Sequence, residues 1–121
     1  MAFAEDECGP TDGPALVIYL LNTEMKGTKV PYPHVRISIW RAAAELSGRT
    51  LRWRNEGPSM GMAVRCSEAG KCQRATSVKL EFRSREADGS IPGALELDFE
   101  DGESIRGGFR AAWRDRQVLC G

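Results

Sequence analysis

Four cysteines, Cys8, Cys66, Cys72 and Cys120, are the residues of this 121-residue chain whose spacing most directly limits its chemistry. A zinc site needs close cysteine pairs or histidines at matching spacing. Here five residues separate Cys66 from Cys72, and the chain has a single histidine. A C-x-x-C redox motif is also absent from the sequence. Disulfides are therefore the favoured interpretation of these cysteines.

The positions of the cysteines favour one pairing. Residues 67–71 are turn-like and lie between two strand-like runs, so Cys66 and Cys72 can face each other across the neck of a hairpin. The remaining bond, Cys8–Cys120, would join the chain ends, which often lie close together in a domain. Such bonds persist in oxidising compartments, so two disulfides predict a periplasmic or secreted protein.

The first residues also favour export. Residues 1–4 (MAFA) match the Ala-x-Ala end of a secretory signal peptide, and three acidic residues follow them. An ordinary cytosolic N-terminus is the alternative, which the cysteines disfavour. We therefore expect residues 1–4 to be the remnant of a signal peptide and residues 5–121 to form a single domain.

Two further clusters contain potential metal ligands. Carboxylates are dense along residues 96–103, and oxygen ligands of this kind bind Ca²⁺. His34 with Met25, Met60 and Met62 offers an imidazole and soft sulfurs, which suit Cu(I). A solvated strand face and ordinary packing account for these residues better, so the sequence predicts no metal site and no cofactor.

Residues 57–61 match the G-x-S-x-G pattern of the nucleophile elbow. That chemistry needs a strand-to-helix turn, followed later in the chain by an acid and a histidine. The one histidine, His34, precedes the motif, and no helical pattern follows it. A Gly/Pro/Ser loop is the better interpretation, so we predict no catalytic residue and no enzyme.

Alternation of apolar and polar residues dominates the chain and predicts about seven strands. The seven runs are residues 15–21, 35–39, 51–54, 62–66, 78–83, 95–100 and 105–114. Most have one apolar face, which is typical of an antiparallel β-sandwich or flattened barrel. Residues 41–46 contain good helix formers and predict at most one short helical turn.

The last predicted hairpin has one register that keeps its apolar faces together. A loop over residues 100–102, with Gly102 in the left-handed region, pairs Leu97 with Ile105. The same register places Glu96 opposite Arg106, so carboxylates and guanidinium groups share the outer face.

Charge and hydropathy exclude two classes of partner. Lys+Arg and Asp+Glu each number 17, so the net charge is +0, whereas nucleic-acid binders are normally basic. No apolar run approaches the roughly 20 residues of a membrane helix. We therefore expect no nucleic acid and no integral membrane segment.

Several residues of types that are common at protein interfaces indicate a binding surface. Two prolines enclose one tyrosine in a stiff loop, and a basic stretch with a tryptophan follows, a combination enriched at protein interfaces. The alternative is a register-setting loop and solvated arginines. The candidate surface comprises Tyr32, His34, Arg36, Trp40, Arg52 and Arg54.

The sequence thus predicts an exported, disulfide-stapled, non-enzymatic binding module for a protein or a cell-envelope component. Inhibition of a partner enzyme is one form of this function. The alternatives are a periplasmic protein that binds Ca²⁺ or copper, a small hydrolase, and a structural subunit of the envelope. No motif in the chain is specific to one family.

Overall fold

The computed structural model describes residues 1–10, 13–25, 27, 29–55 and 60–115. In this part of the chain, nine strands and one 3-10 turn, η1 (Ala43–Glu45), follow one another. The strands are β1 (Ala2–Cys8), β2 (Pro14–Leu21), β3 (His34–Ile39), β4 (Thr50–Arg54), β5 (Gly61–Glu68), β6 (Lys71–Arg74), β7 (Ser77–Phe82), β8 (Ile91–Asp98) and β9 (Ser104–Trp113). The predicted all-β class is therefore confirmed.

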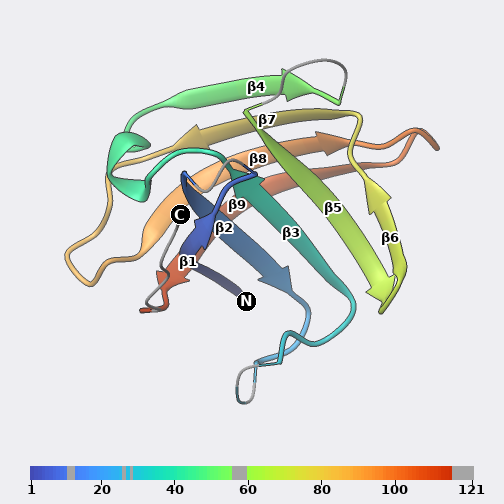
Figure 1. Cartoon of the computed structure of the whole chain (residues 1–121), viewed down its shortest axis with the longest axis horizontal. Coiled ribbons are helices and arrows are strands. Elements are labelled where there is room, and N and C mark those ends of the chain that lie inside the picture. Colours follow the sequence, from blue (N-terminus) through green and yellow to red (C-terminus); the bar gives the residue numbers. More distant parts are fainter. Residues whose placement is uncertain (11–12, 26, 28, 56–59, 116–121) are drawn as a thin grey trace.

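All nine strands belong to one sheet, in the order β4-β7-β8-β9-β1-β2-β3-β5-β6. The β1–β9 pair is parallel and the other pairs are antiparallel. In Figure 1, β4, β7, β8 and β9 run across the top, while β2, β3 and β5 descend across them. The sheet is thus curled into a half-barrel, and it is mixed where the sequence predicts purely antiparallel strands. The two separate layers of a sandwich are not seen.

One bent segment carries the chain from one side of the half-barrel to the other. Ala75 donates its backbone N–H to Ala63 on β5, whereas Thr76 donates to Asp98 at the end of β8. Residues 71–82 therefore pair with β5 through β6 and with β8 through β7. The bend thus links the two sides of the curled sheet. The core lies between these two sides, on the concave face.

The concave face supplies the hydrophobic core. Alternate residues of the curled strands point inward, and the side chains of Ile18, Ile37, Leu80 and Leu97 are fully buried there. Burial of apolar surface of this kind is the main stabilising term in folding. Each strand whose sequence alternates between apolar and polar residues places its apolar side in this core.

β1 is the clearest difference from the sequence-based prediction. Residues 2–4 belong to this strand, which pairs with β2 along its whole length and with β9 at Phe3 and Ala4. Phe3 and Ala4 are buried, as is Glu5. Alternation is hidden in this segment because residues of both faces are covered. The predicted cleavage after residue 4 stays a prediction, but residues 2–4 are part of the sheet.

The predicted hairpin register is confirmed. Leu97 pairs with Ile105 and Glu96 with Arg106, and Gly102 has a φ of 86°. The N–H of Phe99 donates to Glu103, so residues 100–102 form the loop. The predicted helical turn over 41–46 is present as the shorter η1.

A disulfide joins Cys66 to Cys72, which are direct partners in the β5–β6 register. This confirms the predicted pairing across a hairpin neck. The predicted Cys8–Cys120 bond involves Cys120, which lies outside the described residues, and it stays a prediction. Within the described ranges, no helix has the length and apolar character needed to cross a membrane.

Candidate functional site

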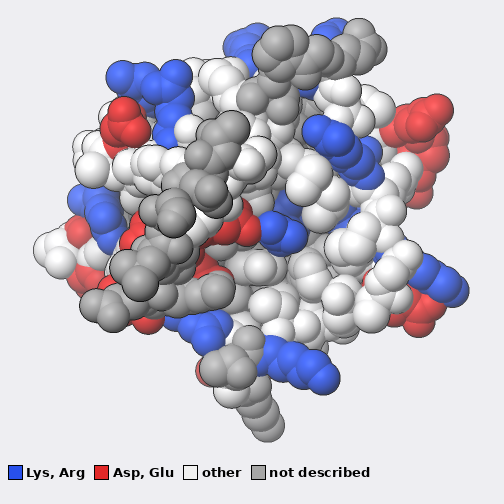
Figure 2. Space-filling view, in the orientation of Figure 1, with Lys and Arg blue, Asp and Glu red and all other residues white. Residues whose placement is uncertain are grey.

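A cavity of about 690 Å³ lies at one open end of the half-barrel. Its apolar floor consists of Leu20, Val35 and Ile105, which also pack against the core. Gln73 and Lys71 of β6 lie along its polar side. Figure 2 shows that the surface over β3 and β5 is mostly uncharged, with a few basic side chains within it. Hydrophobic clefts of this size with a few polar groups are typical small-ligand sites. We call it the mouth groove.

Arg65 closes the inner end of the mouth groove. Its alternation on β5 places it on the inward side with Ala63, opposite Val35. The guanidinium lies over the ring of Phe99, with Cζ 4.0 Å from the ring centroid. It also donates to Gln73, with Nε 2.8 Å from Oε1. A charged residue at a core-facing position thus stacks on an aromatic ring and finds polar partners.

The same guanidinium joins two hairpins. Nη2 lies 2.8 Å from Oδ2 of Asp101, and Nη1 lies 2.9 Å from Oε2 of Glu103. Both carboxylates belong to the β8–β9 turn, whereas Gln73 belongs to β6. Arg65 therefore connects the tip of one hairpin to the body of the other, and its side chain is only 22% exposed.

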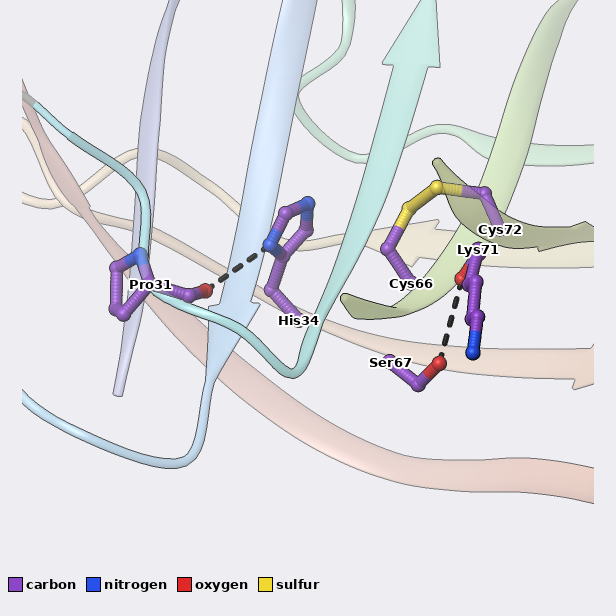
Figure 3. Close-up of a disulfide and its surroundings, with 6 residues drawn as sticks. All are labelled: Pro31, His34, Cys66, Ser67, Lys71 and Cys72. Atoms are coloured by element: carbon purple, nitrogen blue, oxygen red, sulfur yellow. Dashed lines mark hydrogen bonds between the residues drawn. A yellow bond between two sulfur atoms is a disulfide. The ribbon is translucent and has the colours of Figure 1, made fainter. Parts of the chain in front are cut away.

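The disulfide and His34 form another wall of the mouth groove. Figure 3 shows Cys66–Cys72 spanning β5 and β6, with the imidazole of His34 on the neighbouring strand β3. His34 Nδ1 lies 3.0 Å from the carbonyl oxygen of Pro31. Ser67 donates its hydroxyl to the carbonyl of Lys71 at 3.5 Å, within the loop that the disulfide closes. These contacts order both hairpin ends beside the cavity.

An aromatic row leads from β1 to the edge of the mouth groove. Phe3 stacks on Tyr19 with ring centroids 4.8 Å apart, and Tyr19 meets His34 edge-on at 5.7 Å. Tyr32 packs on His34 at 4.7 Å and is 46% exposed. The row holds the Tyr32 ring against His34, a lining residue of the groove, and Tyr32 offers apolar surface at low entropic cost.

The structure does not bring all six predicted surface residues together. Tyr32, His34 and Arg36 lie next to one another, and Arg36 donates to Glu7 at 2.6 Å. Trp40 lies beyond the opposite end of β3, where its backbone N–H bonds Met60. Arg52 and Arg54 lie on β4, at an edge of the sheet. The predicted surface therefore divides into three separate places.

The residues considered as metal ligands either contact arginine side chains or lie far apart from one another. Glu96 and Asp98 each lie 3.4 Å from Arg106, and Arg65 engages both Asp101 and Glu103. In the described ranges, no three His, Cys, Asp or Glu residues are grouped as a metal site would require. Met62 pairs with Ser38, at the other end of β3 from His34, and Met25 contacts Arg114. Residues 57–59 of the G-x-S-x-G pattern lie outside the described part.

The acidic end of the β8–β9 hairpin predicts a specific pH dependence. Hydroxyls of Ser104 and Ser77 donate to Asp98 and lower its pKa below the usual 3.8. The backbone N–H of Glu103 lowers the pKa of Asp101 in the same sense, followed by the charge of Arg65. A lowered pKa in the folded state means that the carboxylates stabilise the fold above the usual pKa and lose this effect as the pH falls through the folded value.

Urea unfolding from about pH 6 down to about pH 2.5 should therefore show stability falling below about pH 4. An Asp98→Asn variant is expected to be less stable at neutral pH and to lose less on acidification, because one of the contributing carboxylates is gone. Parallel curves for the variant and the wild type would contradict this assignment of Asp98.

Comparison with protein-family models, with curated proteins and with solved structures finds no match to this chain.

Proposed function

We propose that this protein is an exported, non-enzymatic binding module whose mouth groove takes an apolar group of a protein or a cell-envelope component. The observation that carries the proposal is the groove itself, a cavity of about 690 Å³ with an apolar floor at the open end of the half-barrel. The exposed ring of Tyr32 packs on His34, which lines the groove.

The chemistry of the groove supports binding over hydrolysis. The described residues that line it include no aspartate or glutamate. Its one histidine, His34, has Nδ1 at hydrogen-bond distance from the backbone carbonyl of Pro31. General acid–base catalysis needs a titratable side chain within hydrogen-bond reach of the proton that is transferred, and carboxylates, the commonest such groups besides histidine, are absent from the described lining. Arg65 has its guanidinium committed to Gln73 and to the β8–β9 turn. These residues orient a ligand and hold the walls in place.

The disulfide supports the exported location, because cross-strand disulfides such as Cys66–Cys72 persist in oxidising compartments. A structural envelope subunit is the alternative without a soluble ligand. It predicts a stable homo-oligomer in sizing chromatography and no saturable binding to the groove, so the two functions separate experimentally.

The neutral fluorescent probe N-phenyl-1-naphthylamine tests the groove. Its fluorescence should rise saturably on titration with the protein, because the apolar floor excludes water around the probe. An Ile105→Glu variant should weaken this binding by about tenfold or more, since it places a charge in the floor.

Met62→Glu is the matched control, because Met62 is also half-buried but lies at the far end of β5. It should bind the probe as the wild type does, once both variants are shown to be folded by circular dichroism. The absence of saturable binding to the wild type, or an equal loss in both variants, would refute the groove as the binding site.

A further inference from the structure

β4 forms one edge of the sheet, and its hydrogen-bonding pattern leaves one side of its backbone open. Phe82 donates to the carbonyl of Arg49, and Asn55 donates to the carbonyl of Thr76. Because bonded pairs alternate in an antiparallel ladder, Leu51 and Trp53 also bond to β7. The N–H and C=O groups of residues 50, 52 and 54 therefore point away from β7, and no described strand pairs with them.

The side chains along this edge are basic. Arg52 and Arg54 alternate with the inward-facing Trp53, so both lie on the outer face, and both are exposed. Neither makes an ion pair with any described residue. Lys79 of β7 lies opposite Arg52 in the register, but its Nζ pairs with Oε1 of Glu81 at 3.3 Å, so among the described residues the unpaired cations of this edge are the two arginines.

A shallow cleft of about 390 Å³ adjoins these side chains on the outer face. Its acidic members, Glu96 and Asp98, are already engaged by Arg106. The guanidinium groups of Arg52 and Arg54 lie nearest the free edge and form no ion pair with a described residue there, although the charge of Arg54 contributes, after the serine hydroxyls, to lowering the pKa of Asp98. Guanidinium groups bind carboxylates in a bidentate manner, so an acidic ligand complements this surface.

Self-association through this edge is disfavoured by the same charges. Arg52 is the central residue of the five-residue strand. Antiparallel pairing of two β4 strands about a two-fold axis would place arginines of the two copies opposite or next to each other, and like charges in such positions destabilise a sheet. Edge charges of this type are a known guard against self-pairing.

We propose that the free edge of β4 binds an extended acidic segment of another protein, which adds to the sheet as a further strand. The backbone groups of residues 50, 52 and 54 supply the main-chain hydrogen bonds, and Arg52 and Arg54 select carboxylates at alternate positions of the segment. This site is independent of the mouth groove, to which β4 contributes no residue.

An alternating glutamate–valine peptide of about eight residues, labelled with fluorescein, is the probe. Its anisotropy should rise on titration with the full chain, whereas a lysine–valine peptide of equal length should not bind. In ¹⁵N spectra, the amides of Arg52 and Arg54 should become protected from hydrogen exchange when the acidic peptide is bound. Protection of these amides is the signature of strand addition.

Two variants separate charge from strand pairing. Arg52→Glu/Arg54→Glu should weaken binding of the acidic peptide by about tenfold or more. The double variant Arg74→Glu/Arg83→Glu changes the net charge equally at other exposed arginines and should leave binding unchanged. Thr50→Pro keeps both edge arginines and removes one outward N–H that β7 does not use, so it should fold and still bind several-fold more weakly.

Three results would overturn the proposal. One is equal weakening by the two charge variants, and another is full binding by Thr50→Pro without protection of the edge amides, since both indicate electrostatic attraction alone. The third is a concentration-dependent dimer in sedimentation that Arg52→Glu disrupts, since the occupant would then be a second copy of the chain.

Discussion

A Gly93→Ala variant is expected to lose about 1–3 kcal/mol of unfolding free energy, because the added methyl group has no room. Gly93 lies in β8 between Phe82 on β7 and Phe109 on β9. A Cβ atom there would lie 2.3 Å from the carbonyl oxygen of Glu81 and 2.7 Å from Cζ of Phe109. The aromatic ring can rotate away, but the carbonyl belongs to the backbone of the neighbouring strand. The strands must therefore separate locally.

Gly108→Ala is the matched control for this prediction. Gly108 lies on the adjacent strand, and the atom nearest to a Cβ added there would be the carbonyl oxygen of Gly93 at 3.6 Å, an ordinary contact. The alanine there should be tolerated, and it also restricts the unfolded chain. Urea midpoints of the two variants and the wild type measure the difference at an unchanged m-value. Equal midpoints for Gly93→Ala and Gly108→Ala would show that β7 and β8 can move apart freely.

The strands with one buried face were predictable from the sequence, and so was the β8–β9 register. In 95–100 and 105–114, the apolar side faces the core, and Gly102 takes the left-handed conformation that a three-residue loop needs. Only one register keeps Leu97 beside Ile105. Local physical constraints thus determine this hairpin almost completely.

Two strands are not among the seven runs of alternating residues, for different physical reasons, although the predicted hairpin at Cys66 and Cys72 implied the second of them. β1 has buried residues on both faces, including Glu5, so its sequence does not alternate and its charge suggests exposure. β6 has only four residues, and most of them are exposed, so it lacks an apolar side. Both are recognised only through their partners. The mixed, curled sheet depends on them, since β1 makes the parallel pair with β9 and β6 forms an edge.

The site was less predictable than the fold, because its parts are distant in sequence. The mouth groove combines the ends of β2 and β3 with the β5–β6 hairpin and Ile105 of β9. Tyr32 and His34 were identified from their loop, yet the cavity that His34 lines was not. One local signal was present: Arg65 follows Ala63 by two residues on a strand, which places a charge on the inward side.

Arg65 is also the site of the second large expected effect. An Arg65→Met variant should lose about 2 kcal/mol of unfolding free energy. The methionine retains apolar contact with Phe99 but leaves Gln73 and the carboxylates of Asp101 and Glu103 without their shared donor. Arg106→Met is the control, since Arg106 also contacts two carboxylates but is 58% exposed. Exposed ion pairs contribute little, so Arg106→Met should change the urea midpoint far less.

Hydrogen exchange distinguishes a local role of Arg65 from general destabilisation. The N–H of Gly102 bonds the carbonyl of Phe99 inside the β8–β9 turn, next to the two carboxylates that Arg65 holds. In Arg65→Met this amide should exchange faster than amides in the middle of β8, and in Arg106→Met it should not. Equal losses of stability and protection in the two variants would contradict a special role for Arg65. Faster exchange of this amide in Arg65→Met alone would show that Arg65, which closes the mouth groove, also holds the β8–β9 hairpin in place. The contacts that shape the groove would then be the same contacts that stabilise this end of the half-barrel.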